Sequence, residues 1–405
     1  MVMKMIKLIG SEWTKFRESR KNRIIILLLI CYLIGIVFYY VNLDKNYFPL
    51  MLNKMERQSI ESQQKLSDIS LKEEHDKDYE KDPREIEFLT LENQTSVLLM
   101  SHYEAPKFSD WKQYLERENR KFNNLIFGEE NNYINLNVLK ARNQDPAKLK
   151  QQIIRNEYLI ENDIEIDLSP YKLSGIQFLT FLLKSHSPMI IIVFAMILSI
   201  DVFLGEMEEG SYKLYFTQPY SRKRIYWSKI LGVLLFIIGI IFALIIVLFI
   251  IVSIIYGVGK INFPQVIGSK EILTSLTNNA KILGQFQVIS TSQYLILGYI
   301  QLLFMMIMTI LSTVALSTWL NSISKTLGLT TGLIMLNYVF EATVTYKSIL
   351  RFVSPLSYLN IEQVIKGEVN ASYLVGIIIS IALSIVLTSI SYVRFINSDL
   401  LGTEN

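Results

Sequence analysis

Hydrophobic residues gather in long blocks along the chain, and polar residues fill the stretches between them. A block of roughly 20 mostly apolar residues is typical of a helix that crosses a lipid bilayer. We predict six transmembrane helices, at residues 24–41, 185–204, 230–258, 290–319, 327–346 and 373–393. The fifth block is the weakest, because Glu341 lies inside it. The pattern predicts an all-α polytopic membrane protein.

Basic residues near the ends of these blocks predict the orientation, since cytoplasmic loops are enriched in Lys and Arg. They cluster before the first block and after the second, at Lys4, Lys7, Lys15, Arg17, Arg20, Lys21, Arg23, Lys213, Arg222, Lys223, Arg224 and Lys229. Both clusters are expected in the cytoplasm, so both termini are cytoplasmic and residues 44–184 are extracellular. Residues 259–289 form an extracellular loop, and 347–371 form an extracellular or re-entrant segment. The tail 394–405 returns to the cytoplasm.

The first block also has the basic flank of a signal peptide. No small-residue cleavage site follows it, and the chain continues with Phe38, Tyr39 and Tyr40. We therefore interpret residues 24–41 as a retained anchor.

Residues 44–184 differ sharply in composition from their neighbours, with dense alternating charges from 45 to 87. The scarcity of Gly, Pro and alternating hydrophobic patterns there predicts a mostly helical extracellular domain. The charge run is typical of a solvated face, and a role in capturing substrate is the alternative.

The overall composition excludes several classes of function. Hydrophobic residues make up 51% of the chain and charged residues 19%, whereas soluble domains average about 25% charged. One cysteine, Cys31, excludes an internal disulfide and a thiolate metal cluster, and three scattered histidines argue against a histidine metal site. A net charge of +3 does not indicate a nucleic-acid partner. The sequence has no GxxxxGK[ST], HExxH or GxSxG motif, so we expect no catalytic site, no metal and no cofactor bound by this chain.

Residues 1–20 have the pattern of an amphipathic helix. Apolar side chains recur on one face, at Met5, Leu8, Ile9, Trp13 and Phe16. Such a helix lies along the membrane surface, and Trp13, Lys15 and Arg17 are its predicted interfacial anchors. The alternative is a simple basic flank to the first span.

The most informative polar stretch is the cytoplasmic loop at residues 205–229. Pro219 breaks the chain there, and Ser221 is placed to cap a helix whose first turn contains Arg222. A short helix beneath the membrane, joined to two spans, suits a force-transmitting contact with a cytosolic partner. An ordinary positive loop is the alternative.

This loop resembles that of the ABC-2 family of transporter permeases. The matching pattern is Glu206, Gly210, Ser211, Pro219, Ser221, Arg222 and Lys229. The N-terminal helix resembles that family's elbow helix, and the Ser354-Pro355 turn resembles its external Ser-Pro turn. The large insert after the first span is absent from short members, although a subgroup in low-GC Gram-positive bacteria looks similar there. The richness in Lys, Ile and Asn suits such a genome, and a bacterial cell membrane is the expected location.

The resemblance implies a permease subunit that pairs with itself or with a related permease, and with two copies of a separate ATP-binding cassette ATPase. That partner would bind ATP and Mg. A coupling helix at about 210–225 would sit in a groove of the ATPase. The residues expected to couple are Glu206, Glu209, Gly210, Ser211, Pro219, Ser221, Arg222, Arg224 and Lys229.

The implied activity is export of an amphipathic or hydrophobic compound, such as a peptide, an antibiotic or a lipid. An ABC-linked peptide sensor or immunity protein would use the same loop and is not separated from an exporter by sequence. Mechanotransmission proteins have four spans, against the six predicted here. A channel is disfavoured because no Gly-rich filter loop is evident.

Polar residues inside the predicted spans are candidates for a translocation path, because ionisable groups there are costly and often functional. Glu341 and Gln301 are the candidates. The alternative for Glu341 is an interfacial position at an early helix end. Asp201 is close to the cytoplasmic end, where a helix-end or coupling role is favoured. Thr309, Ser312 and Thr313 are expected to pack helices.

Overall fold

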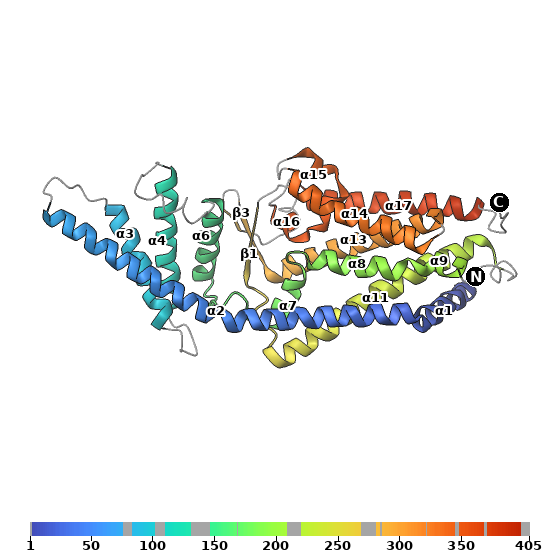
Figure 1. Cartoon of the computed structure of the whole chain (residues 1–405), viewed down its shortest axis with the longest axis horizontal. Helices are drawn as coiled ribbons and strands as arrows, with labels where there is room; N and C mark the ends of the chain where they lie inside the picture. The colour runs from blue at the N-terminus through green and yellow to red at the C-terminus, as the bar shows by residue number, and fades with distance from the viewer. Residues whose placement is uncertain are drawn as a thin grey trace.

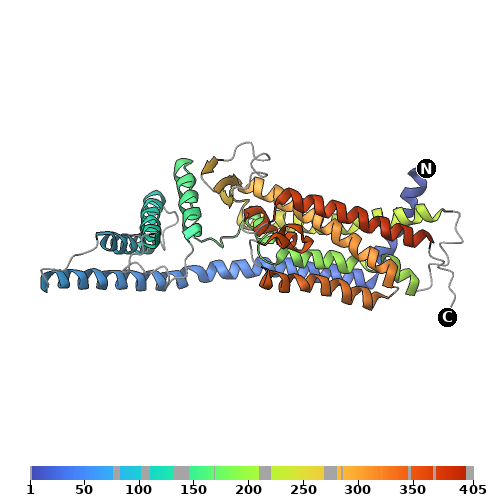
Figure 2. The ribbon, with the colours of Figure 1, turned by 90° about the horizontal axis from the view of Figure 1, so that it is seen from above.

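The computed structural model is elongated, with a helical bundle at one end and a smaller projecting part at the other (Figure 1). It describes residues 2–75, 83–101, 110–130, 146–167, 169–208, 220–268, 281–283, 286–320, 322–344, 348–367 and 371–397. The first and last described residues, 2 and 397, lie at the same end of the bundle, far from the projecting part. Turned by 90°, the two parts remain separated along the long axis (Figure 2).

One helix, α2 (Arg20–His75), runs through both parts. Its 56 residues correspond to about 84 Å at 1.5 Å per residue. The predicted span 24–41 lies in its first half, but the helix does not end near residue 44, where the extracellular domain was predicted to begin. The chain has no glycine between Gly35 and the end of α2. The charged residues Asp44 and Lys45 make this part of the helix more hydrophilic, but they do not end the helix. Pro49 lies inside the helix and removes one backbone donor.

Five helices in the described ranges are long and apolar enough to cross a membrane. They are α2, the stretch Ser187–Gly205, α11 (Arg222–Tyr256), α13 (Thr291–Leu320) and α17 (Tyr373–Asn397). They coincide with five of the six predicted blocks. The block 327–346 lies largely in α14 (Ile323–Thr343), which is not among these five helices. The predicted count of six spans therefore stays a prediction.

The bundle has an inner and an outer set of helices. In the most apolar stretches of Ser187–Gly205 and α13, 61% and 56% of residues are buried, against 22% for α2 and α11 and 17% for α17. Large apolar side chains on the outer helices are exposed, including Leu27, Leu235 and Ile385. Such a surface suits a hydrocarbon environment or contact with another membrane protein. Helix α13 is thus packed inside, and the outer helices surround it.

A separate short helix precedes the predicted second span. A short helix α7 (Gly175–Leu182) precedes α8 (Ser187–Ser199), and α9 (Asp201–Glu208) continues from it. The chain turns between α7 and α8 at Ser185, whose φ of 55° lies in the left-handed region. Pro188, in the first turn of α8, suits a helix start.

The turn between α7 and α8 is tied to the segment that precedes the last span. That segment folds as α15 (Ile349–Val353), the 3₁₀ helix η2 (Pro355–Leu359) and α16 (Ile361–Lys366). The Ser185 amide donates to the Glu362 carboxylate at 3.0 Å, and Lys366 Nζ lies 2.6 Å from the same group. Burial tends to raise the pKa of Glu362, but Lys366, the Ser185 amide and Lys184 outweigh it and hold the pKa below its usual value.

The projecting part is built on the second half of α2. Helix α3 (Pro83–Ser101) lies against α2, with Ser62 Oγ 3.1 Å from Glu92 and Ser59 Oγ 2.6 Å from Asn93. Helices α4 (Trp111–Glu130) and α6 (Pro146–Glu161) follow. The expectation of a mostly helical structure agrees with these elements.

A small antiparallel sheet lies where the sequence suggested only a loop. Its strands are β1 (Pro264–Gly268), β2 (Lys281–Leu283) and β3 (Phe286–Ser290), in the order β1-β3-β2. The strands have five residues or fewer. In such short segments, alternation of apolar and polar residues does not distinguish a strand from a loop. The sheet lies between α6 and the bundle (Figure 1).

Small residues let α17 approach α13 and η2 closely. Gly376, Ser380 and Ser384 follow one another at four-residue spacing on a buried face of α17. A Cβ at Gly376 would collide with the Tyr358 ring and would lie 3.0 Å from Gln301 Nε2. Tyr373 reinforces the contact by donating to the Leu297 carbonyl at 3.1 Å.

Gly376→Ala is expected to destabilise the bundle by ~1–3 kcal/mol, because an added methyl group overpacks this contact. The measurement is the melting temperature of the purified chain in detergent. The matched control is Gly239→Ala on the exposed face of α11, where an added Cβ meets no atom within 4 Å. An equal effect of the two substitutions would contradict the close packing at Gly376.

Candidate functional site

The candidate site is the end of the bundle that carries both termini, where α9 and α11 flank residues 209–219 (Figure 1). Several predicted coupling residues lie outside the described residues: Glu209, Gly210, Ser211, Pro219 and the side chain of Glu206. The geometry is therefore built from the two flanking helices and the helices that contact them. We call this set the loop platform: α1, the first turns of α2, α9, the first turns of α11 and the last turns of α17.

A buried ion pair joins the N-terminal helix to α11. Helix α1 (Val2–Glu18) presents Glu12, whose two carboxylate oxygens both lie 3.3 Å from Lys229 Nζ. The Lys229 side chain is 2% exposed and that of Glu12 10%. The same ammonium donates to the Val202 carbonyl of α9 at 3.2 Å. Lys229 thus connects three helices, two of which flank residues 209–219.

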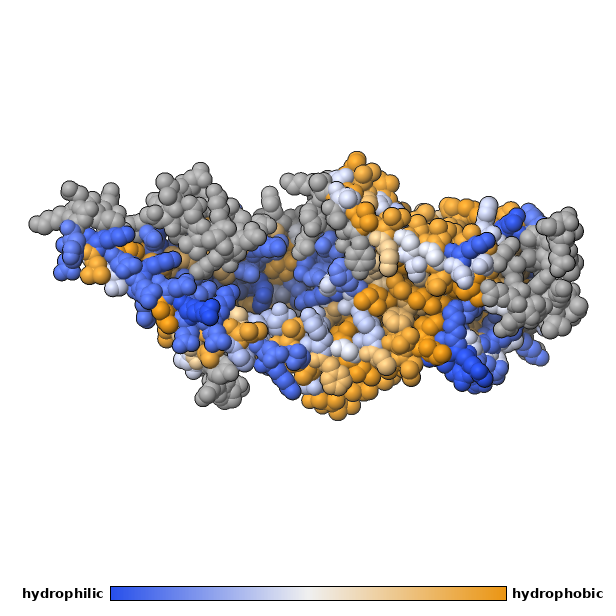
Figure 3. Space-filling model, in the orientation of Figure 1, coloured by the Kyte–Doolittle hydropathy of each residue, from blue (hydrophilic) through white to orange (hydrophobic). Residues whose placement is uncertain are grey.

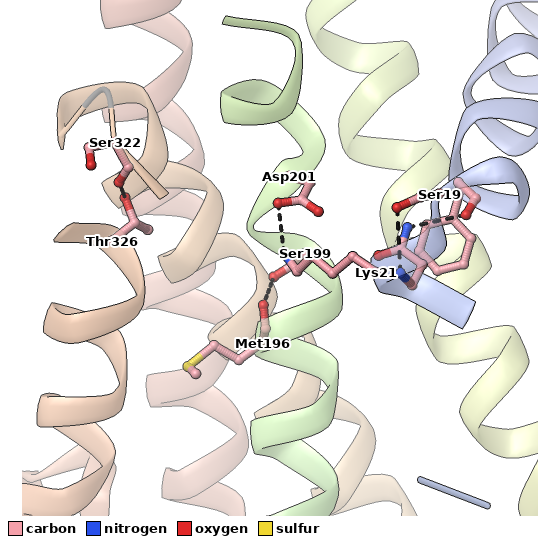
Figure 4. A network of polar contacts seen from close by, with 9 residues as sticks. Ser19, Lys21, Met196, Ser199, Asp201, Ser322 and Thr326 are labelled. Atoms are coloured by element: carbon pink, nitrogen blue, oxygen red, sulfur yellow. Dashed lines mark hydrogen bonds and ion pairs between the residues drawn. The ribbon is translucent and has the colours of Figure 1, made fainter. Parts of the chain in front are cut away.

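A second ion pair joins α2 to the first residue of α9. Lys21 Nζ lies 2.6 Å from the Asp201 carboxylate, and Figure 4 shows the lysine side chain reaching across to α9. This pair is partly exposed, so it contributes less than a buried pair. Asp201 lies at a helix start, where its negative charge is favourable. The helix-end or coupling role favoured for Asp201 from sequence stays a prediction.

The connection between α1 and α2 is fixed by local hydrogen bonds. The side-chain amide of Asn22 donates from Nδ2 to the Phe16 carbonyl at 3.2 Å. The backbone amide of Asn22 donates to Ser19 Oγ at 3.4 Å. Ser19 is labelled beside Lys21 in Figure 4. The angle between α1 and α2 is therefore held by the same residues that lie next to the Lys21–Asp201 pair.

Helix α11 is also attached to the last turns of α17. Arg222 donates to the Ile396 carbonyl at 2.9 Å, and the Tyr226 hydroxyl donates to the Thr388 carbonyl at 2.9 Å. The fully buried Tyr226 ring packs on Phe203 of α9 and Phe395 of α17, with centroid distances of 5.9 and 5.6 Å. Both helices that flank the loop are thus coupled to the C-terminal helix.

The predicted coupling residues that are described fall into two groups. Ser221 is the N-cap residue of α11 and Arg222 begins the helix, as expected, although the Ser221 side chain makes no cap hydrogen bond. Residues 222–225 are the first turn of the long helix α11 and not part of a separate short helix. Arg224 is half-buried near the loop, whereas Lys229 is buried within the platform.

The predicted interfacial anchors lie on α1. Trp13 is 38% exposed and packs against Phe236 of α11 at 5.0 Å between ring centroids. Lys15 and Arg17 are exposed. Leu8 of the same helix is buried. The amphipathic pattern therefore serves contact with α11 as well as the exposed surface.

The two candidates for a translocation path are not brought together by any described contact. Gln301 is fully buried on α13, and its side-chain amide has no hydrogen-bond partner among the described residues. Glu341 lies in α14, and its side chain is outside the described set. An unpaired buried amide costs free energy, so Gln301 is the more informative of the two.

No group of three or more His, Cys, Asp or Glu side chains suited to a metal ion is found in the described ranges. The loop platform contains hydrogen bonds, ion pairs and aromatic contacts that join helices. Its arrangement is suited to transmitting movement between a loop and a bundle.

Sequence reasoning located the loop and missed its attachments. Glu12 and Lys229 are 217 residues apart, and no local pattern pairs them. One signal was present: Arg222, Tyr226 and Lys229 recur at helical spacing in the first two turns of α11, which places three polar groups on one face. Such a polar stripe at the start of a span predicts buried partners.

Comparison with known proteins gives one family. The model of the ABC-2 family transporter protein matches residues 11–400. No match is found among curated proteins or among solved structures. The matched range includes Glu12, the whole loop and the last turns of α17. It therefore contains every residue pair described above for the loop platform.

Glu12→Gln and Lys229→Met are each expected to destabilise the chain by ~3–5 kcal/mol, because each leaves the other charge buried without its partner. The double substitution is expected to cost less than the sum, since neither charge remains. Melting temperatures in detergent measure the cycle. Arg17→Met, an exposed change on α1, is the control and should be within about 0.5 kcal/mol of the unaltered chain. Additive effects of the two single substitutions would refute the coupling.

Proposed function

The chain belongs to the ABC-2 family of transporter proteins, and from that membership we propose that it is the permease of an exporter for an amphipathic or hydrophobic compound. Membership makes it the multi-pass membrane subunit of an ABC transporter. ATP is hydrolysed by an ABC ATPase partner, since a permease of this family has no ATPase site of its own. Export, and a peptide, antibiotic or lipid as cargo, are the proposed part.

The observation that carries the proposal is the attachment of both loop-flanking helices to the rest of the bundle. The α9 end of the loop is held through Asp201 and Val202, and the α11 end through Arg222, Tyr226 and Lys229. A partner that displaced residues 209–219 would therefore also move α1, α2 and α17. Residues 210–225 are the proposed contact with the ATPase.

In the proposed cycle, ATP binding closes two ATPase subunits and changes the distance between two permease loops. Each nucleotide state must then favour one arrangement of the helices, because a ligand shifts an equilibrium only by its differential affinity for the two states. The loop platform at the cytoplasmic end converts the displacement into a movement of α1, α2 and α17. Lys229 acts within the platform through Glu12, because it is buried too deeply to touch another chain.

The proposed assembly has two permeases, either two copies of this chain or this chain with a related one. Exposed apolar side chains on α14 support such a contact, among them Leu333, Met335 and Leu336. Lipid covers the remaining outer surface. Both termini and the loop then face the cytoplasm in a bacterial cell membrane, and the projecting part faces outward.

The second candidate is an ABC-linked peptide sensor, an immunity protein or a mechanotransmission protein. The continuous helix α2 favours this reading, because it connects the projecting part directly with the loop platform. In that case the ATPase would work without moving cargo across the bilayer.

The first test is co-purification with the ATPase encoded beside this chain's gene, expressed together in detergent. The two proteins should co-elute and hydrolyse ATP. The double substitution Glu209→Ala with Arg224→Ala should lower co-elution at least about 10-fold, because it removes two charges at the proposed contact. Lys325→Ala, an exposed change on α14, is the matched control and should retain binding. Failure of the unaltered chain to associate would overturn the proposal.

Proteoliposomes with both subunits separate the two candidate functions. Export predicts ATP-dependent movement of a fluorescent amphiphile across the bilayer, whereas a sensor predicts ATP hydrolysis without movement.

Gln301→Leu should raise the melting temperature, because it removes an unpaired buried amide worth ~1–3 kcal/mol, and should slow transport. Glu341→Gln should slow transport with normal assembly. Unchanged transport in both variants would remove these residues from the path.

A further inference from the structure

A large cavity lies between the projecting part and the bundle. Its volume is about 830 Å³, and its walls come from α2, α4, α6, residues 166–177, β1 and α16. Figure 3 shows a hollowed, hydrophilic surface between the two parts, next to the orange apolar surface of the bundle. Cavities of roughly 300–1,000 Å³ are typical of sites for small organic ligands.

The cavity has two chemically different walls. Helix α2 provides an apolar wall with Phe48, Met51, Leu52 and Met55. The other walls are basic: six Lys or Arg side chains line the cavity against two Asp or Glu. The apolar wall begins at Phe48, seven residues beyond the end of the predicted span 24–41 on the same helix.

The two acidic side chains of the lining already have partners. The Glu118 carboxylate accepts from the Tyr114 hydroxyl at 2.8 Å and from the Asn156 amide at 3.0 Å. Asp167 lies 2.7 Å from Lys172 and 3.9 Å from Lys260. With six basic side chains against two acidic ones, the lining keeps an excess of basic groups, which includes Arg155 on α6 and Lys184 before α8.

Arg155 and Lys184 carry that excess. The Arg155 guanidinium lies 5.3 Å from the Phe263 ring and the Lys184 ammonium 5.5 Å from the Phe181 ring. Neither side chain has a hydrogen bond or a close ion pair with the described residues. Burial lowers the pKa of Arg155, with partial compensation from Glu118. Burial also lowers the pKa of Lys184. The negative charge of Glu362 partly offsets this effect of burial, whereas the positive charges of Lys366 and Arg155 lower the Lys184 pKa further. An anion between these groups would relieve both the desolvation and the repulsion.

We propose that this cavity binds an amphiphile with an anionic head group, with its hydrocarbon chain on the α2 wall and its phosphate or carboxylate beside Arg155 and Lys184. Charge-assisted hydrogen bonds from Arg and Lys are the strong contacts for such groups. The apolar side chains of α2 distinguish the ligand from a small free anion. The inference rests on the proposed function in taking the chain as a carrier of amphipathic compounds, and it specifies the charge of the compound.

The test is lipid binding by the purified chain in a non-ionic detergent, without the ATPase and without ATP. The probe is dioctanoyl phosphatidylglycerol, followed by isothermal titration calorimetry. The comparison ligands are dioctanoyl phosphatidylcholine, which has no net charge, and inorganic phosphate, which has no chain. We expect saturable binding of the probe, binding of phosphatidylcholine at least about 10-fold weaker because it lacks the net charge, and binding of phosphate at least about 100-fold weaker because it buries no chain.

The double substitution Arg155→Gln with Lys184→Gln should weaken probe binding at least about 10-fold, because two charged contacts are removed. Lys148→Gln, an exposed change in the same lining, should weaken it about threefold, and it keeps the test decisive if the double variant does not fold. The matched control is Arg57→Gln with Lys65→Gln, which removes two exposed charges from α2 outside the lining and should leave affinity unchanged.

Equal affinity for the anionic and zwitterionic lipids, or equal losses in the cavity and control variants, would overturn the inference. Phosphate binding as tight as the lipid would refute the amphiphile and indicate a small-anion site. Lack of lipid binding in a chain that still co-elutes with the ATPase would overturn this inference alone. Lipid binding without co-elution would overturn the proposed coupling alone.

Discussion

The arrangement of the bundle depends on the cost of burying a charge. Lys229 lies in the second turn of α11, where its ammonium is almost completely removed from solvent. A buried ammonium is tolerated only with hydrogen-bonding partners, and Glu12 and the Val202 carbonyl supply them. This requirement fixes α1 and α9 against the start of α11. The Lys21–Asp201 and Arg222–Ile396 contacts then extend the same set of attachments to α2 and α17.

The sequence was sufficient for the helices and insufficient for their attachments. Apolar blocks predicted five helices that are long enough to cross a membrane, because block length and hydropathy are local properties. The pairing of Glu12 with Lys229 and of Arg222 with the Ile396 carbonyl joins residues more than 170 apart, and no periodicity encodes such a contact. The strands β1, β2 and β3 were missed because they are short. The continuity of α2 was missed because a change of composition was taken as a change of structure.

The loop platform and the basic cavity lie at opposite ends of the bundle, and α2 is common to both. Near its start, Lys21 contacts α9, and further along, Phe48, Met51 and Met55 line the cavity. Occupancy of the cavity and displacement of the loop therefore act on a single helix. Such an arrangement gives a physical basis for coupling between two distant sites, since both contact one continuous helix.

The uninterrupted course of α2 also constrains how the chain can change in evolution. Ser59 and Ser62 hold α3 to one face of this helix, while Lys21 and Leu29 belong to the face that packs on the bundle. One inserted residue between these regions would rotate the outer face by about 100° and move it by about 1.5 Å. Single-residue insertions or deletions between residues 42 and 58 should therefore be rejected. Seven residues, close to two turns, would restore the rotation but shift the outer face by about 10.5 Å along the axis. The number of residues between the two faces of α2 is thus constrained by the helical repeat, even where the individual side chains are exposed.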